Sequence, residues 1–171
     1  MTSSLGCDEM TGPGPEPCTS PETSQLDFWL GSWDLTWPAS QSGGMEGEVA
    51  HGTNQIEKIL KGCVVEERFA TADGGFLGRS HSAFDPKARV WRQTWVDSAG
   101  GYLVFEGGLS GFGFELRTAP TERNGQTVIN RMVFSDIRPA SLEWAWQAST
   151  DGETWRDLWN ISYRRQDGSD G

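Results

Sequence analysis

The sequence predicts an all-β domain, an antiparallel up-and-down β-barrel of about ten strands, with a short N-terminal helical turn and a disordered N-terminal tail. Three observations indicate this fold. Apolar and polar residues alternate along most of the chain, as in strands with one buried face. Turn-forming pairs such as Asn124-Gly125 and Asp151-Gly152 separate the alternating runs. The 171 residues include 22 Gly and 9 Trp, which suits tight hairpins that carry bulky inward side chains.

The chain is expected to form one domain with two short terminal segments. Residues 1–24 are rich in Pro, Gly, Ser, Thr and Glu. Such a segment cannot bury enough apolar surface to offset the entropy of ordering, so it is predicted to be a disordered tail. The barrel domain is expected over residues 25–165 and a disordered C-terminus over residues 166–171. A helical turn is predicted over residues 25–30, and residues 54–61 are compatible with either helix or strand.

The predicted strands follow one another with a turn signal after each. The first contains Trp33, Leu35 and Trp37 and ends at Pro38, and Trp33 is expected to fill the closed end of the barrel. The others are expected over residues 46–60, 63–69, 76–85, 90–97, 102–107, 112–118, 126–134, 142–149 and 155–164. A meander of this kind removes its exposed strand edges by closing into a barrel.

Alternation along each strand also predicts which side chains face the interior. Tryptophans from several strands are expected to share the lumen: Trp91, Trp95, Trp144, Trp146 and Trp159. Polar side chains fall on the same inward faces: Glu67, Ser80, Ser82, Gln93, Asn130, Asp157 and Tyr163. Phe112 and Trp155 are also predicted to point inward. Because a slip of one residue inverts a strand, each placement depends on the strand having no bulge.

Charge and cysteine content exclude several classes of protein. The formal net charge of −10 repels phosphate and anionic lipid headgroups, so neither nucleic-acid nor membrane binding is expected. No apolar run approaches the roughly 20 residues needed to cross a bilayer, and the N-terminus lacks the pattern of a secretory signal. The 3 cysteines, Cys7, Cys18 and Cys63, are an odd and sparse set, for which reduced thiols in a cytoplasmic protein are expected.

Metal and phosphate motifs do not occur in the sequence. The only two histidines, His51 and His81, are scattered, and no Cys-x-x-Cys or His-Glu-x-x-His pattern is present. His81 is expected on the outer face as an ordinary surface histidine. No metal and no cofactor are therefore predicted, and the protein is expected to be a monomer or a homodimer.

Several segments carry a family resemblance. Residues 27–33 end in Gly31-Ser32-Trp33, which matches the Gly-x-Trp signature of lipocalins and other calycins. Further segments agree with it: residues 62–67, 84–86, 91–97, 149–155 and 163–165. Over about residues 26–165 the chain resembles a bacterial family of small calycin-like barrels of unknown function. The resemblance implies a barrel whose lumen holds a small, mostly apolar ligand.

Two better-understood barrels are distantly similar, and the sequence departs from both. Nitrobindin-like barrels hold heme through a histidine near the C-terminal strands, whereas His51 and His81 lie in the first half of this chain. Fatty-acid-binding proteins hold a carboxylate with an Arg-x-Tyr pair on the last strand. Here the last strand reads Ile161-Ser162-Tyr163-Arg164-Arg165, so the resemblance implies neither heme nor a fatty acid.

Two functions remain open at this point. The first is binding of a small apolar or aromatic molecule in the Trp-rich lumen, with the tryptophans above and Gln93, Ser80, Ser82 and Asn130 as the wall. The alternative is an enzyme, a cyclase, isomerase or hydro-lyase that acts on a polyketide- or terpenoid-like molecule. Its acid or base would be Glu67, Asp157 or Tyr163. The tryptophans could instead fill the lumen completely, which would leave a packed barrel that serves as an interaction module. Glu67 could likewise form a structural ion pair with an arginine such as Arg131.

Overall fold

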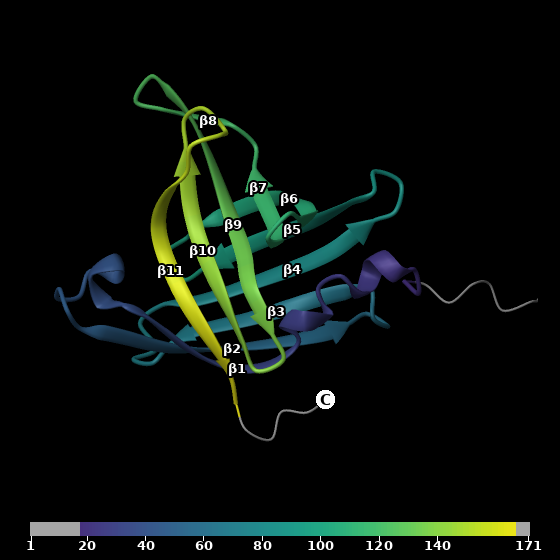
Figure 1. Cartoon of the computed structure of the whole chain (residues 1–171), viewed down its shortest axis with the longest axis horizontal. Helices are drawn as coiled ribbons and strands as arrows, with labels where there is room; N and C mark the ends of the chain where they lie inside the picture. The colour runs from purple at the N-terminus through teal and green to yellow at the C-terminus, as the bar shows by residue number, and fades with distance from the viewer. Residues whose placement is uncertain (1–17, 167–171) are drawn as a thin grey trace, which may run out of the picture.

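The computed structural model describes residues 18–166 and confirms the all-β barrel. Ten strands form a closed antiparallel ring (Figure 1). They are β1 (Gly31–Pro38), β2 (Val49–Ile59), β3 (Val64–Thr71), β4 (Leu77–Asp85), β5 (Val90–Asp97), β6 (Tyr102–Ser110), β7 (Gly113–Thr118), β9 (Gln126–Arg138), β10 (Ser141–Ser149) and β11 (Arg156–Arg165). The ambiguous residues 54–61 belong mainly to β2, so strand alternation was the correct interpretation there.

Neighbours in the ring are neighbours in the chain, with one short interruption. The ring closes where β11 pairs with β1, with Trp33 opposite Arg165. The extra strand β8 (Thr121–Arg123) pairs only with β9, in a hairpin outside the ring. Its turn, Asn124-Gly125, has φ angles of 51° and 75°, a left-handed pair that asparagine and glycine tolerate best. β8 was not predicted, because three exposed polar residues carry no alternation signal.

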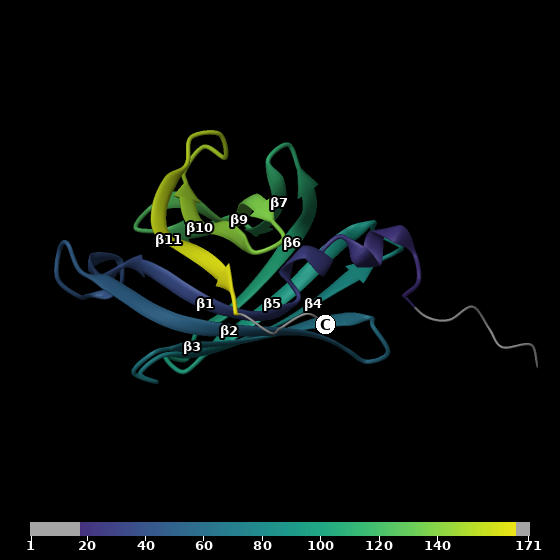
Figure 2. The same cartoon turned by 60° about the horizontal axis from the view of Figure 1, so that its bottom comes forward.

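Three short 3-10 helices complete the fold: η1 (Pro21–Ser24), η2 (Asp27–Trp29) and η3 (Ala39–Ser42). The predicted helical turn corresponds to η2. Figure 2 shows η1 and η2 at the end of the barrel that lies away from the β1–β2 hairpin. There Trp29, at the end of η2, is buried together with Leu26. The N-terminal segment therefore closes one end of the barrel.

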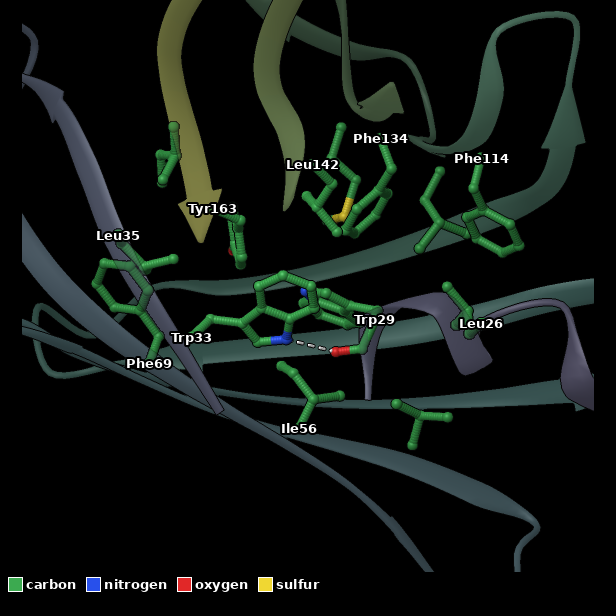
Figure 3. Close-up of a cluster of buried hydrophobic side chains, with 14 of the residues drawn as sticks. Leu26, Trp29, Trp33, Leu35, Ile56, Phe69, Phe114, Phe134, Leu142 and Tyr163 are labelled. Carbon is green, nitrogen blue, oxygen red and sulfur yellow. Dashed lines mark hydrogen bonds between the residues drawn. The ribbon is translucent and has the colours of Figure 1, made fainter. Parts of the chain in front are cut away.

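This closed end is packed with aromatic side chains. Trp33 is fully buried, and its indole Nε1 donates a hydrogen bond of 2.8 Å to the backbone oxygen of Trp29 (Figure 3). Phe134 packs edge-on against Trp29 with ring centroids 5.0 Å apart. The guanidinium of Arg165 covers the other side, 4.1 Å from the Trp33 ring centroid. At this end the interior is filled, as predicted for Trp33.

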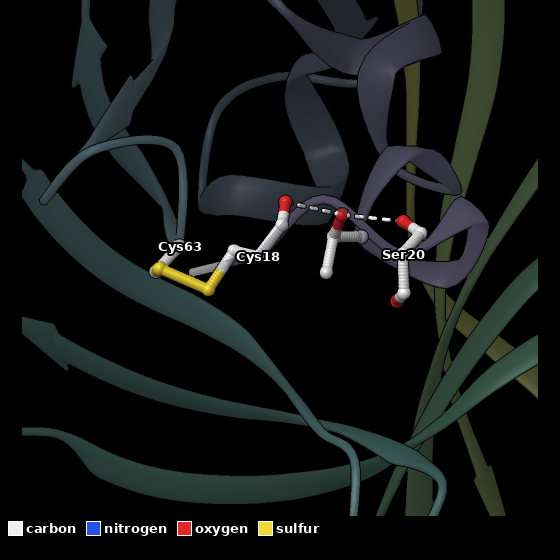
Figure 4. The surroundings of a disulfide bond; sticks show 4 residues. Cys18, Ser20 and Cys63 are labelled. Carbon is white, nitrogen blue, oxygen red and sulfur yellow. Dashed lines mark hydrogen bonds between the residues drawn. A yellow bond between two sulfur atoms is a disulfide. The ribbon is translucent and has the colours of Figure 1, made fainter. Parts of the chain in front are cut away.

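Two predictions about the N-terminal region are corrected. Cys18 and Cys63 form a disulfide that ties the N-terminal segment to the β2–β3 turn (Figure 4), whereas free thiols were expected. The predicted tail also ends earlier than residue 24, since η1 is ordered and Thr23 Oγ1 lies 2.8 Å from the Cys18 oxygen. Composition could not show this, because one covalent bond replaces the missing apolar contacts. Residues 1–17 and 167–171 of the predicted termini lie outside the described residues.

A third correction concerns strand parity near the C-terminus. The pairing of β10 with β11 shifts by one residue, so that Trp146 lies opposite Trp159 but Gln147 lies opposite Asp157. Such a bulge inverts the side-chain alternation on one side of it. Asp157 is therefore exposed, and it accepts a hydrogen bond from Gln147. Trp155 lies against the guanidinium of Arg131 instead of facing the lumen.

Phe112 was also predicted to face inward and does not. It is 64% exposed and lies in the turn before β7. Alternation with Phe114 and Leu116 suggested a longer strand, but Gly113, with φ of 149°, begins β7 one residue later. The predicted strand was one residue too long, which changed the placement of its first side chain.

Candidate functional site

A cavity of about 210 Å³ opens at the end of the barrel opposite Trp33. Aromatic rings form most of its wall. The indoles come from η2, β5, β10 and β11: Trp29, Trp95, Trp144, Trp146 and Trp159. The phenyl rings come from β3, the β3–β4 loop and β6: Phe69, Phe76 and Phe105. The lumen is thus filled at one end and hollow at the other.

The rings of the wall support one another at steep angles. Trp144 and Trp159 meet at 90° with centroids 5.9 Å apart. Phe69 meets Trp159 at 79°, and Phe105 meets Trp146 at 77°. Edge-to-face pairs of this kind are favourable and leave the aromatic wall little freedom to collapse. The cavity is therefore a preformed feature of the packing.

A polar cluster lies at the inner side of the cavity. Glu67 Oε1 accepts a hydrogen bond of 2.7 Å from Asn54 Nδ2, and Glu67 Oε2 accepts one of 2.6 Å from Ser80 Oγ. Asn54 Nδ2 also donates to Tyr163 Oη at 3.1 Å. Asn54, Ser80 and Glu67 are all buried. Strands β2, β3, β4 and β11 position this cluster, since each contributes one inward residue.

Burial changes the acidity of two groups in this cluster. It raises the pKa of Glu67 to about 6, against the hydrogen bonds from Ser80 and Asn54, which favour the carboxylate. Burial also raises the pKa of Tyr163 above its ordinary value, and the nearby Glu67 charge adds to this effect. Tyr163 is therefore a neutral phenol at neutral pH, whereas the carboxyl group of Glu67 titrates at about pH 6.

At the rim, Asp97 holds one of the indoles in place. Its Oδ2 accepts a hydrogen bond of 2.9 Å from Trp95 Nε1. Its Oδ1 accepts bonds from the backbone N–H groups of Ala99 and Gly101. Partial burial acts to raise the pKa of Asp97, but these hydrogen bonds outweigh it, and the pKa lies below its ordinary value. Asp97 is thus a carboxylate at the mouth of the cavity.

Two indole N–H groups at the cavity have no hydrogen-bond acceptor among residues 18–166, namely Trp29 Nε1 and Trp159 Nε1. The Trp29 indole lies beside the Tyr163 hydroxyl, but no hydrogen bond of normal geometry joins them. Unpaired buried donors are uncommon, and they mark places where a bound molecule or water gains a hydrogen bond.

A second, wider groove of about 560 Å³ adjoins the cavity at the open end. Phe76 and Trp159 border both spaces. The far side of the groove carries polar residues: Gln41 from η3, His51 from β2 and Asp73 from the β3–β4 loop. The groove connects the aromatic chamber with a polar rim.

The structure brings six of the predicted site residues to the cavity wall. They are Glu67, Trp95, Trp144, Trp146, Trp159 and Tyr163. Ser80 lies behind Glu67 as its hydrogen-bond donor. Asn130 is buried elsewhere and donates to the backbone oxygen of Gln147. The exposed Asp157 lies on the outer face, so its predicted place in the lumen is wrong.

The prediction that Trp91 and Gln93 line the cavity is also wrong. Trp91 lies toward the closed end, packs against Phe114 and donates to Gln25 Oε1 at 3.1 Å. Gln93 Nε2 donates to Ser82 Oγ at 2.8 Å, and these two buried side chains pair across strands β4 and β5. Both side chains face inward as predicted. They lie away from the cavity because of their position along the barrel axis, which alternation within a strand does not predict.

The predicted pair of Glu67 with Arg131 does not form. Arg131 lies on the outside of β9, where it binds Glu115 at 2.7 Å and Gln147 at 2.6 Å. His81 is on the outer face as predicted, 3.3 Å from Glu66. Asn54 was missed as a site residue, although the alternation of Gly52, Asn54 and Ile56 along β2 places it inward.

Two further searches cover the described part of the chain. Within residues 18–166, no group of three or more His, Cys, Asp or Glu side chains converges as metal ligands would. No helix in that range is long and apolar enough to span a membrane.

Comparison with known proteins places the chain in a family. No curated protein matches it. A family model described as a protein of unknown function, DUF1579, matches residues 19–165, which include every strand of the barrel. The match begins at the residue after Cys18 and ends with the last residue of β11. The chain therefore belongs to the DUF1579 family.

Proposed function

We propose that the protein binds a small apolar or aromatic molecule in the cavity at the open end of its barrel. The observation that carries this proposal is the contrast between the two ends of the lumen. Buried side chains such as Trp29 and Trp33 pack one end, whereas at the other end Trp95, Trp144, Trp146 and Trp159 surround an open space. Ligand sites are typically concave and apolar, with a few polar groups that orient the ligand.

The size of the cavity limits the ligand. An engineered apolar cavity of about 150 Å³ is known to hold benzene, so the cavity of about 210 Å³ suits a body of one or two rings. A longer molecule would extend into the adjoining groove past Phe76 and Trp159. Because a single chain forms the whole cavity, binding needs no second subunit. A calycin-like mode of binding, with the ligand inside the barrel, is part of this proposal.

An enzyme that uses the same cavity is the second candidate. Glu67 favours it, because a carboxyl group with a pKa of about 6 at a cavity wall can give or take a proton near neutral pH. Tyr163 is the only other group from the predicted catalytic set that lines the cavity. The substrate would be a small cyclic molecule whose reaction needs positioning and one proton transfer.

Native mass spectrometry of the protein purified from its own host tests the binding function. We expect an added mass that is released on unfolding and that belongs to a small apolar compound. The same compound should quench or shift tryptophan emission when it is added back to stripped protein. Release of a chemically altered compound after incubation would favour the enzyme.

A matched pair of variants locates the site. Leu103 lines the cavity, whereas Val104, the next residue of β6, is 49% exposed on the outer face. Leu103→Trp should fill the cavity and abolish binding, and Val104→Trp should leave binding unchanged. Equal binding by both variants would exclude the cavity as the ligand site.

A further inference from the structure

Within residues 18–166, no cationic side chain forms an ion pair with the buried carboxylate of Glu67. Its side chain is only 6% exposed, and its oxygens accept hydrogen bonds from two neutral groups, Asn54 and Ser80. The charge of Arg79 acts on Glu67, but its guanidinium donates to the backbone oxygens of Phe69 and Gly78 and forms no ion pair with Glu67. A buried carboxylate without an opposite charge is costly, so a cation beside Glu67 would be strongly favoured.

The ionisable groups of the cavity wall are of one sign. Glu67 at the inner side and Asp97 at the rim both line it. Among the described residues that line the cavity there is no lysine, arginine or histidine. An anionic ligand would therefore enter a space with two acids and no basic partner. The formal net charge of −10 adds a long-range preference for cations.

The aromatic wall has the same preference. The face of an indole carries negative potential and attracts organic cations, most strongly in a desolvated site. Trp144 and Trp159 meet at 90°, and Trp159 and Phe69 at 79°, so the rings present faces and edges in different directions around the space. Perpendicular aromatic rings beside a carboxylate form a cage of the kind that recognises methylated ammonium groups.

We propose that the cavity binds an organic cation, a small tertiary or quaternary ammonium compound with an apolar body. This inference rests on the proposed binding function and names the ligand class. The ammonium group lies toward Glu67, where it compensates the buried charge, and the apolar body lies against the tryptophans. A methylated ammonium fits better than a metal ion, because it is weakly hydrated and needs no ligand set, which the described residues do not provide.

The proposal predicts a specific pH dependence. Glu67 titrates at about pH 6, so it loses its charge as the pH falls from 7.5 to 5. Tyr163 from β11 faces it and stays neutral, and Arg79, which is exposed on the outer side of β4, acts on it through charge alone. Asp97 at the rim keeps its charge, since its pKa lies below the ordinary value. Cation binding should therefore weaken over this range through Glu67.

The test compares two probes of the same shape. Phenyltrimethylammonium and tert-butylbenzene differ in one central atom and in charge, and calorimetry on the full chain measures the affinity of each. At pH 7.5 we expect the cation to bind at least about tenfold more tightly, a difference of about 1.4 kcal/mol. At pH 5 this preference should shrink, while the affinity for tert-butylbenzene stays the same. Benzoate should not bind.

Variants assign the preference to the buried charge. Glu67→Gln keeps the shape of the side chain and should remove most of the preference for the cation while binding of tert-butylbenzene persists. Glu66→Gln, which removes the neighbouring carboxylate that binds Arg68 and His81 on the outer face, should retain it. Thermal unfolding verifies that both variants are folded. The pH series on the wild type tests the role of the Glu67 charge without a substitution.

The outcomes separate the two proposals. If tert-butylbenzene binds as tightly as the cation, the cation proposal is overturned and the binding function stands. The cation proposal is also overturned if the preference for the cation is unchanged both at pH 5 and in Glu67→Gln. The negative charge that attracts the cation would then not be that of Glu67. Both proposals fail if neither probe binds and if Leu103→Trp also leaves the binding of the compound from the host unchanged.

Discussion

Gly78 lies directly against the indole of Trp95, and a Cβ atom at position 78 would stand 1.9 Å from Cη2 of that ring. The two residues sit on neighbouring strands, β4 and β5, and Trp95 forms part of the cavity wall. The Asp97 hydrogen bond holds the indole nitrogen, and the ring of Phe76 stacks on the indole with centroids 6.5 Å apart. The absence of a side chain at residue 78 therefore shapes the cavity.

Gly78→Ala should displace Trp95 and alter the cavity. Overpacking of this kind typically costs about 1–3 kcal/mol of stability. We expect a changed tryptophan emission, weaker ligand binding and a lower denaturant midpoint. Gly108→Ala in β6 is the control, because its Cβ would meet nothing within 4 Å, and it should stay within about 0.5 kcal/mol of wild type. Equal effects of the two substitutions would contradict the close contact.

Reduction of the Cys18–Cys63 disulfide should destabilise the barrel. The bond closes a loop with a sequence separation of 45, and such cross-links stabilise mainly by restricting the unfolded chain. We expect a loss of about 2–4 kcal/mol in the free energy of unfolding when a reductant is added. The Cys18→Ser/Cys63→Ser variant should show the same loss and no response to the reductant. A wild type that is indifferent to reductant would mean that the bond does not form in solution.

Glu67 should make the protein less stable as the pH rises. Its pKa is about 6 in the folded protein against an ordinary value of 4.5, so the folded state binds the proton more tightly than the unfolded state. Stability from this group is fully present below about pH 4.5 and is lost as the pH rises through about 6. The loss corresponds to about 2 kcal/mol.

Denaturant unfolding of the wild type and of Glu67→Gln, each between pH 4 and pH 7.5, measures this effect. The difference between the two proteins isolates Glu67 from the other carboxyl groups. We expect the variant to gain about 2 kcal/mol on the wild type over that range. If the difference in the free energy of unfolding between the two proteins does not change with pH, the pKa of Glu67 is not raised by folding.

Gln93 should behave as a structural residue. It is 1% exposed, donates to Ser82 and leaves its own Oε1 without a partner among the described residues. Gln93→Leu should change stability by less than about 1 kcal/mol, because a lost hydrogen bond is offset by removal of an unpaired oxygen. The double variant Gln93→Leu/Ser82→Ala should be at least as stable as Gln93→Leu. Ligand binding should persist in both, and its loss would place Gln93 at the cavity after all.

The sequence by itself determined the fold and the inward faces of most strands. Alternation is a local property, and the apolar faces of Trp33, Leu35 and Trp37 or of Val65 and Phe69 are strong enough to set the register of their strands. It also placed Glu67 and Tyr163 inside the barrel, where both are buried. Where one face is clearly apolar, burial follows from sequence alone.

Only the tertiary structure decided which inward residues share a space. Trp91 and Trp95 have the same parity on β5, yet one packs near the closed end and the other lines the cavity, because height along the barrel depends on the stagger of all ten strands. The bulge that turns Asp157 outward arises from the pairing of β10 with β11. The Cys18–Cys63 bond likewise requires two segments to meet that the sequence separates by 45 positions. Each of these depends on contacts between distant strands, which no local pattern contains.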